Sequence, residues 1–310
     1  MSVRDDRTVA TGPAPGSKGP DGVEPARGRP RRTRLDASGD VRTPPWLYVV
    51  LTLGLVLMVV PFVWMVLGSL KPESEIRQVP PTWLPEEVTL ENYSELFQRL
   101  DFLQFFANSL AVAVAVTVGN LAFASMVGYA LAKLDFPGRR VIFALVVGTL
   151  MVPGMAVFIP QFVLVANLGM VNTYPGLILP FLVQPFGIFL MRQYIGGLPD
   201  ELIEAARIDG AGELRIFARV ILPLCGPALA TLAILTFLGS WNNFLWPLVV
   251  AQSEDMYTLP VALALYAVGE NQTSFGLLLA GAVVVAMPMI ALFLVLQKHF
   301  TRAIATTGIK

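Results

Sequence analysis

The chain has 310 residues, of which 55% are apolar and 14% are charged, with 22 basic and 22 acidic side chains. Soluble globular domains are about 45–50% apolar and about 25% charged. This composition, with a mean hydropathy of +0.65, therefore excludes an ordinary soluble domain and indicates a membrane protein. The net charge of zero excludes no class of function by itself.

Five long stretches lack Asp, Glu, Lys and Arg: 46–70, 102–132, 141–191, 220–253 and 271–297. A helix needs about 20 apolar residues to cross a bilayer. The stretch 141–191 would be about 77 Å long as one helix, more than twice the hydrocarbon core, so we expect it to turn back. The sequence NLGMVNTYPG at 167–176 carries the Asn, Gly and Pro signals of a turn.

The sequence therefore predicts an all-α membrane protein with six transmembrane helices. The predicted spans are about 46–69, 106–131, 141–165, 175–195, 224–250 and 276–298. Residues 1–45 are basic and rich in Pro and Gly, and we expect this tail to be disordered. Residues 46–310 then form the transmembrane domain, in which 198–223 connects the fourth and fifth spans.

The 22 Lys and Arg residues are sorted by loop. Nine precede Trp46, three lie in 132–140, four in 192–219 and three at the C-terminus, and with six spans these segments all lie on one side of the membrane. The segments on the opposite side contain only Lys71, Arg77 and Arg99. Basic residues gather in cytoplasmic loops of membrane proteins. We therefore expect a multi-pass protein with both termini in the cytoplasm.

Several chemistries lack their sequence signals. There is no GxxxxGK[ST] phosphate-binding loop, no His/Cys/carboxylate cluster with metal-ligand spacing and no charged side chain in the middle of a predicted span. We expect no catalytic residue, metal or cofactor in this chain and no nucleic-acid partner. A secondary solute transporter or channel is disfavoured because such proteins usually place charged groups in the membrane. That class and a non-transporting membrane scaffold remain the alternatives.

The segment 198–223 is the most informative connection. Pro199 and the acids after it predict a short helix ending near Asp209, where Gly210 can adopt the left-handed conformation. A second amphipathic helix should follow, with Pro223 opening the fifth span. The small Ala205 and Ala206 beside Glu204 suit a helix that docks on another protein, although a surface loop helix fits the same residues.

The same segment resembles the "EAA" loop of ABC importer permeases, whose pattern is E-A-A, three residues, Gly, nine residues and I-x-L-P. Six positions match: Glu204, Ala205, Ala206, Gly210, Leu222 and Pro223. In that family the segment docks into a groove of the ATPase subunit. The resemblance thus implies ATPase coupling through Glu204, Ala205, Ala206, Arg207, Asp209, Gly210 and Pro223.

From about residue 66 onward the chain is similar to the carbohydrate-uptake branch, the maltose-type (MalG-like) permeases. The similarity includes SLKPESEI (69–76), FGIFLMRQY (186–194), FLGSWNNFLWPLV (237–249) and YTLPVAL (257–263). It implies a type I ABC importer permease in a bacterial inner membrane that imports a sugar. It also implies a second homologous permease, an extracytoplasmic sugar-binding protein and an ATPase dimer that holds ATP and Mg²⁺.

Two further groups are candidates for contact with a solute or a binding protein. Ser240, Trp241, Asn242, Asn243 and Trp246 are the most polar and aromatic group at membrane depth. They could line a sugar path, or they could serve helix packing and an interfacial aromatic belt. Outside, we expect the loop of Glu254, Asp255, Tyr257 and Glu270 to contact the binding protein, although an acidic loop can also be solvated surface.

Overall fold

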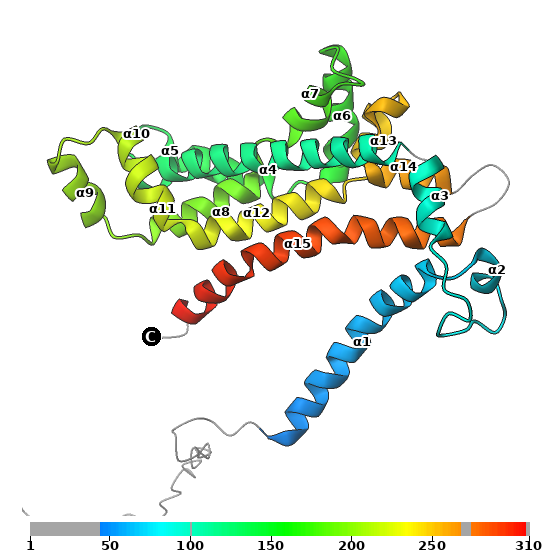
Figure 1. Cartoon of the computed structure of the whole chain (residues 1–310). Coiled ribbons are helices and arrows are strands. Elements are labelled where there is room, and N and C mark those ends of the chain that lie inside the picture. Colours follow the sequence, from blue (N-terminus) through cyan, green and yellow to red (C-terminus); the bar gives the residue numbers. More distant parts are fainter. Residues whose placement is uncertain (1–43, 100, 268–273, 308–310) are drawn as a thin grey trace, which may run out of the picture. The chain divides into compact units, whose positions relative to one another are not determined.

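The computed structural model describes the backbone of residues 44–99, 101–267 and 274–307, and the side chains of 44–98, 101–265 and 274–295. In these residues the regular elements are helices, and no strand occurs (Figure 1). The all-α prediction is confirmed. The chain divides into two compact units, Met1–Leu55 and Val56–Lys310. Most of the predicted disordered tail, residues 1–43, lies outside the described residues.

Three helices are each long and apolar enough to cross a membrane alone. They are α1 (Pro45–Ser69), α4 (Phe102–Lys133) and α15 (Phe275–Thr307). In α15 the part that is long and apolar enough is Phe275–Val295. Their positions agree with the predicted spans 46–69, 106–131 and 276–298. The described part of the chain reaches six possible spans only if three bent helix pairs are each counted as one.

The bent pairs replace three spans that the sequence predicts as continuous helices. α5 (Arg139–Thr149) and α6 (Gly154–Asn167) meet at 103°. The short α7 (Tyr174–Ile178) and η1 (Leu179–Phe181) meet α8 (Pro185–Gly196) at 42°. A third segment, formed by α10 (Glu213–Ile216), η2 (Phe217–Ile221) and α11 (Leu222–Leu224), meets α12 (Gly226–Trp241) at 80°.

Proline explains where these helices break. Pro153 caps the start of α6, and Pro185 and Pro227 lie in the first turns of α8 and α12. Proline has no backbone donor and disfavours helical conformation in the residue before it. Each of these prolines therefore lies at the start of a new helix. The predicted fifth span also stops at Trp241, and the chain resumes as α13 (Leu245–Val250).

The remaining short elements lie between the spans. They are α2 (Glu73–Ile76), α3 (Glu91–Arg99), α9 (Glu201–Ile208), η3 (Glu254–Met256) and α14 (Leu259–Ala267).

Helix α4 packs along α8 and α12 in the unit Val56–Lys310 (Figure 1). Glycine allows the close approach of α4 to α8: a Cβ at Gly128 would lie 2.8 Å from Met191 Cβ and 2.9 Å from the backbone N of Arg192. Small residues at such contacts let helix backbones approach in a membrane. The buried core at this end of α4 includes Ala124, Met191 and Ile221.

Asn120 joins three of these helical segments by hydrogen bonds. It is fully buried in α4; its Oδ1 accepts from the backbone N–H of Gln184 at 3.0 Å, and its Nδ2 donates to Thr236 Oγ1 at 2.9 Å. The first bond satisfies an N–H at the start of α8, and the second reaches α12. A buried amide with both ends paired orients the helices it connects.

Candidate functional site

Helix α9 presents the residues of the E-A-A pattern on two sides. Ile203 is buried and Ala206 is half-buried against the core, whereas Glu204, Ala205 and Ile208 are exposed. Ile208 is 86% exposed, which is unusual for a large apolar side chain. The helix therefore offers an outward face that combines a carboxylate, a methyl group and an apolar side chain.

The start of α9 is tied to the end of α4. Lys133 Nζ donates to the backbone carbonyl of Leu198 and to Asp200 Oδ1, both at 2.6 Å. The Lys133 side chain is 5% exposed, whereas that of Asp200 is 75% exposed. The carbonyl bond and the ion pair together fix the chain just before α9 begins at Glu201.

The end of α9 forms a Schellman turn, as the glycine at this position predicts. The backbone N–H of Ala211 donates to the Ala206 carbonyl and that of Gly210 donates to the Arg207 carbonyl, both at 3.0 Å. Gly210 has φ +78°, the left-handed conformation that this motif requires. A Cβ at Gly210 would meet no atom within 4 Å, so the conformation, and not crowding, favours glycine here.

A chain of two contacts connects α9 to α4 through Glu213. Arg207 on α9 pairs with Glu213 Oε1 (Nε at 2.9 Å and Nη2 at 2.8 Å). The hydroxyl of Tyr129 on α4 donates to Glu213 Oε2 at 2.6 Å. Tyr129 is buried and packs on Phe217, with ring centroids 5.5 Å apart. One carboxylate thus bridges a span and the exposed helix.

This environment favours the charged form of Glu213. The hydrogen bond from the Tyr129 hydroxyl, and then the Arg207 guanidinium, hold the pKa of the Glu213 carboxyl below its usual range, against the opposing effect of burial. Sequence analysis named Arg207 but missed Tyr129 and Glu213. The feature of the sequence that could have identified Glu213 is its position as a single acid directly after Gly210 and Gly212.

Asp209 and Pro223 lie at the ends of helical segments. Asp209 is the exposed C-cap residue of α9. Pro223 lies inside α11, three residues before α12 begins at Gly226. The sequence predicted that Pro223 opens the fifth span. The structure instead places Pro223 before the 80° bend that precedes α12.

Of the five polar and aromatic residues of the predicted substrate path, Ser240, Asn243 and Trp246 line one small pocket, whereas Trp241 and Asn242 do not. Trp241 is buried in one cluster and its Nε1 donates to the Val285 carbonyl, whereas Trp246 is buried in another and its Nε1 donates to the Gly176 carbonyl, both at 3.0 Å. Both indoles therefore serve helix packing. Asn242 is exposed and Ser240 and Asn243 are half-buried at the break between α12 and α13.

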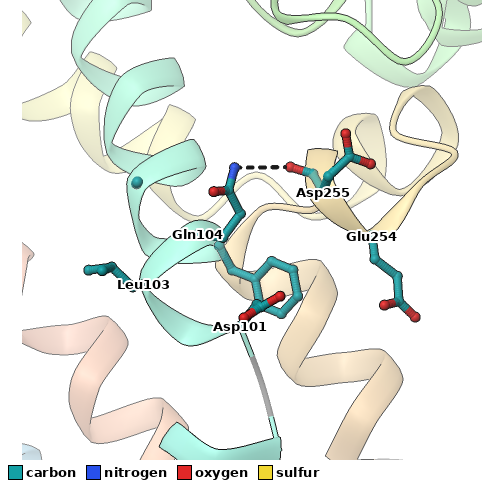
Figure 2. Close-up of a pocket in the computed structure, with 7 residues that line it drawn as sticks. Asp101, Leu103, Gln104, Glu254 and Asp255 are labelled. Atoms are coloured by element: carbon teal, nitrogen blue, oxygen red, sulfur yellow. Dashed lines mark hydrogen bonds between the residues drawn. The ribbon is translucent and has the colours of Figure 1, made fainter.

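Glu254 and Asp255 line an open pocket of about 750 Å³ with Asp101, Gln104 and others (Figure 2). Gln104 Nε2 donates to the Asp255 carbonyl at 3.3 Å, while the two carboxylates remain exposed. Tyr257 is half-buried against an apolar cluster and is less accessible. Glu270, the fourth predicted contact, lies outside the described residues.

Two asparagines that sequence reasoning missed shape the region around this pocket. Asn108 Nδ2 donates to the carbonyls of Asp255 and Tyr257 at 2.7 and 2.9 Å. Asn172, at φ 58°, accepts from the backbone N–H groups of Gln252 and Ser253 at 2.9 and 3.1 Å. The turn signal at 167–176 located Asn172 but not its partners, which are about 80 residues away.

The loop after α1 contains a buried ion pair. Lys71 Nζ lies 3.2 Å from Glu75 Oε1, and both side chains are at most 6% exposed. Thr82 hydrogen-bonds both groups. Glu75 is therefore unavailable to a partner. Among the described residues, no group of three or more His, Cys, Asp or Glu side chains could hold a metal ion.

Comparison with known proteins gives the family. The family model described as "Binding-protein-dependent transport system inner membrane component" matches residues 122–306. The chain belongs to this family. It is 42% identical over 278 residues to the arabinooligosaccharides transport system permease protein AraQ of Halalkalibacterium halodurans, covering 87% of this chain and 99% of that protein. Members of the family are transport permeases, not enzymes.

A second relative and a solved structure agree with this membership. The diacetylchitobiose uptake system permease protein NgcG of Streptomyces coelicolor is 34% identical over 275 residues, covering 88% of this chain and 91% of that protein. A crystal structure of a bacterial ABC transporter that imports the acidic polysaccharide alginate has a chain 28% identical, with a TM-score of 0.74 and coverage of 82% and 95%. The fold is that of an ABC importer permease.

Proposed function

We propose that this permease imports a sugar or oligosaccharide that an extracytoplasmic binding protein delivers, with energy from ATP hydrolysed by a separate subunit. The observation that supports this most is the arrangement of α9. Its exposed face carries Glu204, Ala205 and Ile208, while Lys133 and Tyr129 tie its surroundings to α4. A helix exposed on one side and anchored to a span on the other can transmit a displacement from a docked protein.

In this proposal the ATPase dimer docks on α9, and Glu204 pairs with a basic side chain of its groove. ATP and Mg²⁺ bind in the ATPase and not in this chain. Closure of the ATPase dimer would move α9, and the contacts Arg207–Glu213 and Glu213–Tyr129 would carry that movement to α4. A second, homologous permease completes the pathway across the membrane.

The charge distribution supports the orientation. Nineteen of the 22 basic residues fall in segments that share one side of the membrane with α9. We therefore assign α9 and both termini to the cytoplasm of a bacterial inner membrane. The acidic pocket of Glu254 and Asp255 then faces outward, where it would meet the binding protein.

Two observations bear on the solute. The relatives at 42% and 34% identity are named for arabinooligosaccharides and diacetylchitobiose, which supports a carbohydrate as the solute. Ser240, Asn242 and Asn243, at the break between α12 and α13, offer hydroxyl and amide groups that can hydrogen-bond sugar hydroxyls. We assign the solute contacts of this chain to these three residues, without Trp241 and Trp246.

Co-purification tests the assembly. The chain, expressed with the ATPase and the second permease of its own organism, should extract in mild detergent as a complex whose ATPase activity rises when the loaded binding protein is added. Extraction of the chain alone, with neither subunit attached, would contradict the proposal.

A Ser240→Ala/Asn243→Ala variant should raise the sugar concentration for half-maximal uptake while complex assembly is unchanged.

A further inference from the structure

The segment Glu213–Leu224 follows α9, the helix proposed to dock the ATPase and called the coupling helix below. Apart from Glu213, its residues have no role in the proposed function. It is formed by α10, η2 and α11 and meets α12 at 80°. From Glu213 to Leu224 the helical segment advances by eleven residues at about 1.5 Å each. If α12 lies along the membrane normal, the 80° bend makes this a change in depth of only about 3 Å. The whole segment therefore runs along the membrane surface at the depth where α12 enters the bilayer.

The segment has one buried face and one exposed face. Ile216, Phe217 and Ile221 are buried in the core beside Tyr129. Leu214 is 75% exposed, and Arg215, Ala218 and Arg219 are also exposed. Basic and apolar side chains on the free face of a helix that lies along a membrane surface are typical of interfacial helices.

The two arginines are one helical turn apart and open to a partner. Arg215 and Arg219 have no ion-pair partner among the described residues, whereas the neighbouring Arg207 is paired with Glu213. Both line an open groove of about 620 Å³ together with Gly210, Gly212, Glu213 and Leu214. The carboxylate of Glu213 is already held by Tyr129 and Arg207. Two guanidinium groups at one groove can share the oxygens of a phosphate.

We propose that Arg215 and Arg219 bind the phosphate of an anionic phospholipid at the membrane surface, with Leu214 in contact with the upper acyl chain. The inference rests on the proposed membrane placement of α12 but needs no ATPase. The lipid headgroup is favoured as the occupant because, with α12 along the membrane normal, the 80° bend holds both arginines close to the depth at which α12 begins. A bound lipid would hold the segment that carries Glu213, and thus the base of the coupling helix, at a fixed depth.

The test measures lipid preference of the full chain in nanodiscs of phosphatidylcholine with spin-labelled phosphatidylglycerol or spin-labelled phosphatidylcholine as probe. Wild type should immobilise the anionic probe preferentially. Because one basic residue at an anionic surface contributes about 1 kcal/mol, or roughly fivefold, Arg215→Gln/Arg219→Gln should reduce the preference about tenfold or more. Arg215→Lys/Arg219→Lys should retain most of it.

Arg140→Gln is the matched control, because it removes one exposed charge at the start of α5, away from the groove. This variant should reduce the preference by no more than the roughly fivefold effect of a single surface charge, and by less than Arg215→Gln/Arg219→Gln. An equal probe preference in wild type and Arg215→Gln/Arg219→Gln would overturn the proposal. A second measurement places a nitroxide at Leu214→Cys in a Cys225→Ala background. The proposal would also be overturned if this nitroxide were accessible to bulk water without the ATPase and became immobilised only when the ATPase was added. Since the lipid assay contains no ATPase, its result is independent of whether coupling through α9 fails.

Discussion

The hydroxyl of Tyr129 donates a 2.6 Å hydrogen bond to Glu213, 84 residues later in the chain. Tyr129 lies near the end of the 32-residue helix α4, and Glu213 lies just past the turn that ends α9. The other oxygen of the same carboxylate holds Arg207 of that helix. This bridge connects the exposed helix directly to a transmembrane span, and two of the predictions below depend on it.

Removing the Tyr129 hydroxyl should weaken coupling more than folding. Tyr129→Phe keeps the ring against Phe217 and the Arg207–Glu213 pair, and should lower stability by about 1 kcal/mol. Uptake per ATP hydrolysed, measured in proteoliposomes, should fall several-fold. Ser125→Ala on the same helix, whose hydroxyl bonds only carbonyls of its own helix, is the control. Equal loss of uptake in both variants would argue against a specific role for the bridge.

The left-handed turn after α9 gives a matched pair of glycines. Gly210 has φ +78° and Gly212 has φ −74°, and neither would crowd an added Cβ. Gly210→Ala should therefore disfavour the turn by about 1–2 kcal/mol, whereas Gly212→Ala should be nearly neutral. We expect reduced uptake and faster amide exchange in α9 for Gly210→Ala alone. Identical behaviour of the two variants would show that the turn geometry is not required.

The lowered pKa of Glu213 predicts a pH-dependent contribution to stability. A carboxyl whose pKa is lower in the folded protein stabilises it above the unfolded value, about 4.3, and loses this contribution as the pH falls through the folded pKa. The Tm difference between wild type and Glu213→Gln should therefore be constant above about pH 5.5 and shrink below about pH 4. A difference that grows on acidification would contradict the charged assignment.

Asn172 has two separable roles in the outer turn. Its backbone adopts φ 58°, and its side chain accepts from the N–H groups of Gln252 and Ser253. Asn172→Gly retains the backbone freedom but removes the amide, whereas Asn172→Ala removes both. Hydrogen exchange at residues 252 and 253 should accelerate in both variants, and the Tm should fall further for Asn172→Ala. Unchanged exchange in Asn172→Gly would contradict the role of the amide.

The sequence could predict those features that depend on neighbouring residues. The charge-free stretches identified the long helices α1, α4 and α15, and Gly210 identified the end of α9. The breaks at Pro153, Pro185 and Pro227 were less predictable, because proline within a membrane helix can produce either a kink or a new helix. Only packing by neighbouring helices decides between them.

Contacts between distant residues could not be predicted from one sequence. Tyr129 and Asn120 look like ordinary polar positions in an apolar helix, and nothing local pairs them with Glu213 and Thr236. The group at 240–246 was predicted as a unit because its members are neighbours in sequence. The structure separates them because Trp241 and Trp246 lie on either side of the helix break and pack into different clusters.

The central claim is that α9 receives the ATPase, and cross-linking tests it most directly. Cys225 is the only cysteine and is buried, so a Cys225→Ala chain is a suitable background for Ala205→Cys. With cysteines along the docking groove of the co-expressed ATPase, oxidation should form a disulfide at Ala205→Cys whose yield changes when ATP and Mg²⁺ are added, and none at an outer control, Gln252→Cys. A complex that assembles and transports but forms no cross-link at Ala205→Cys would contradict the claim.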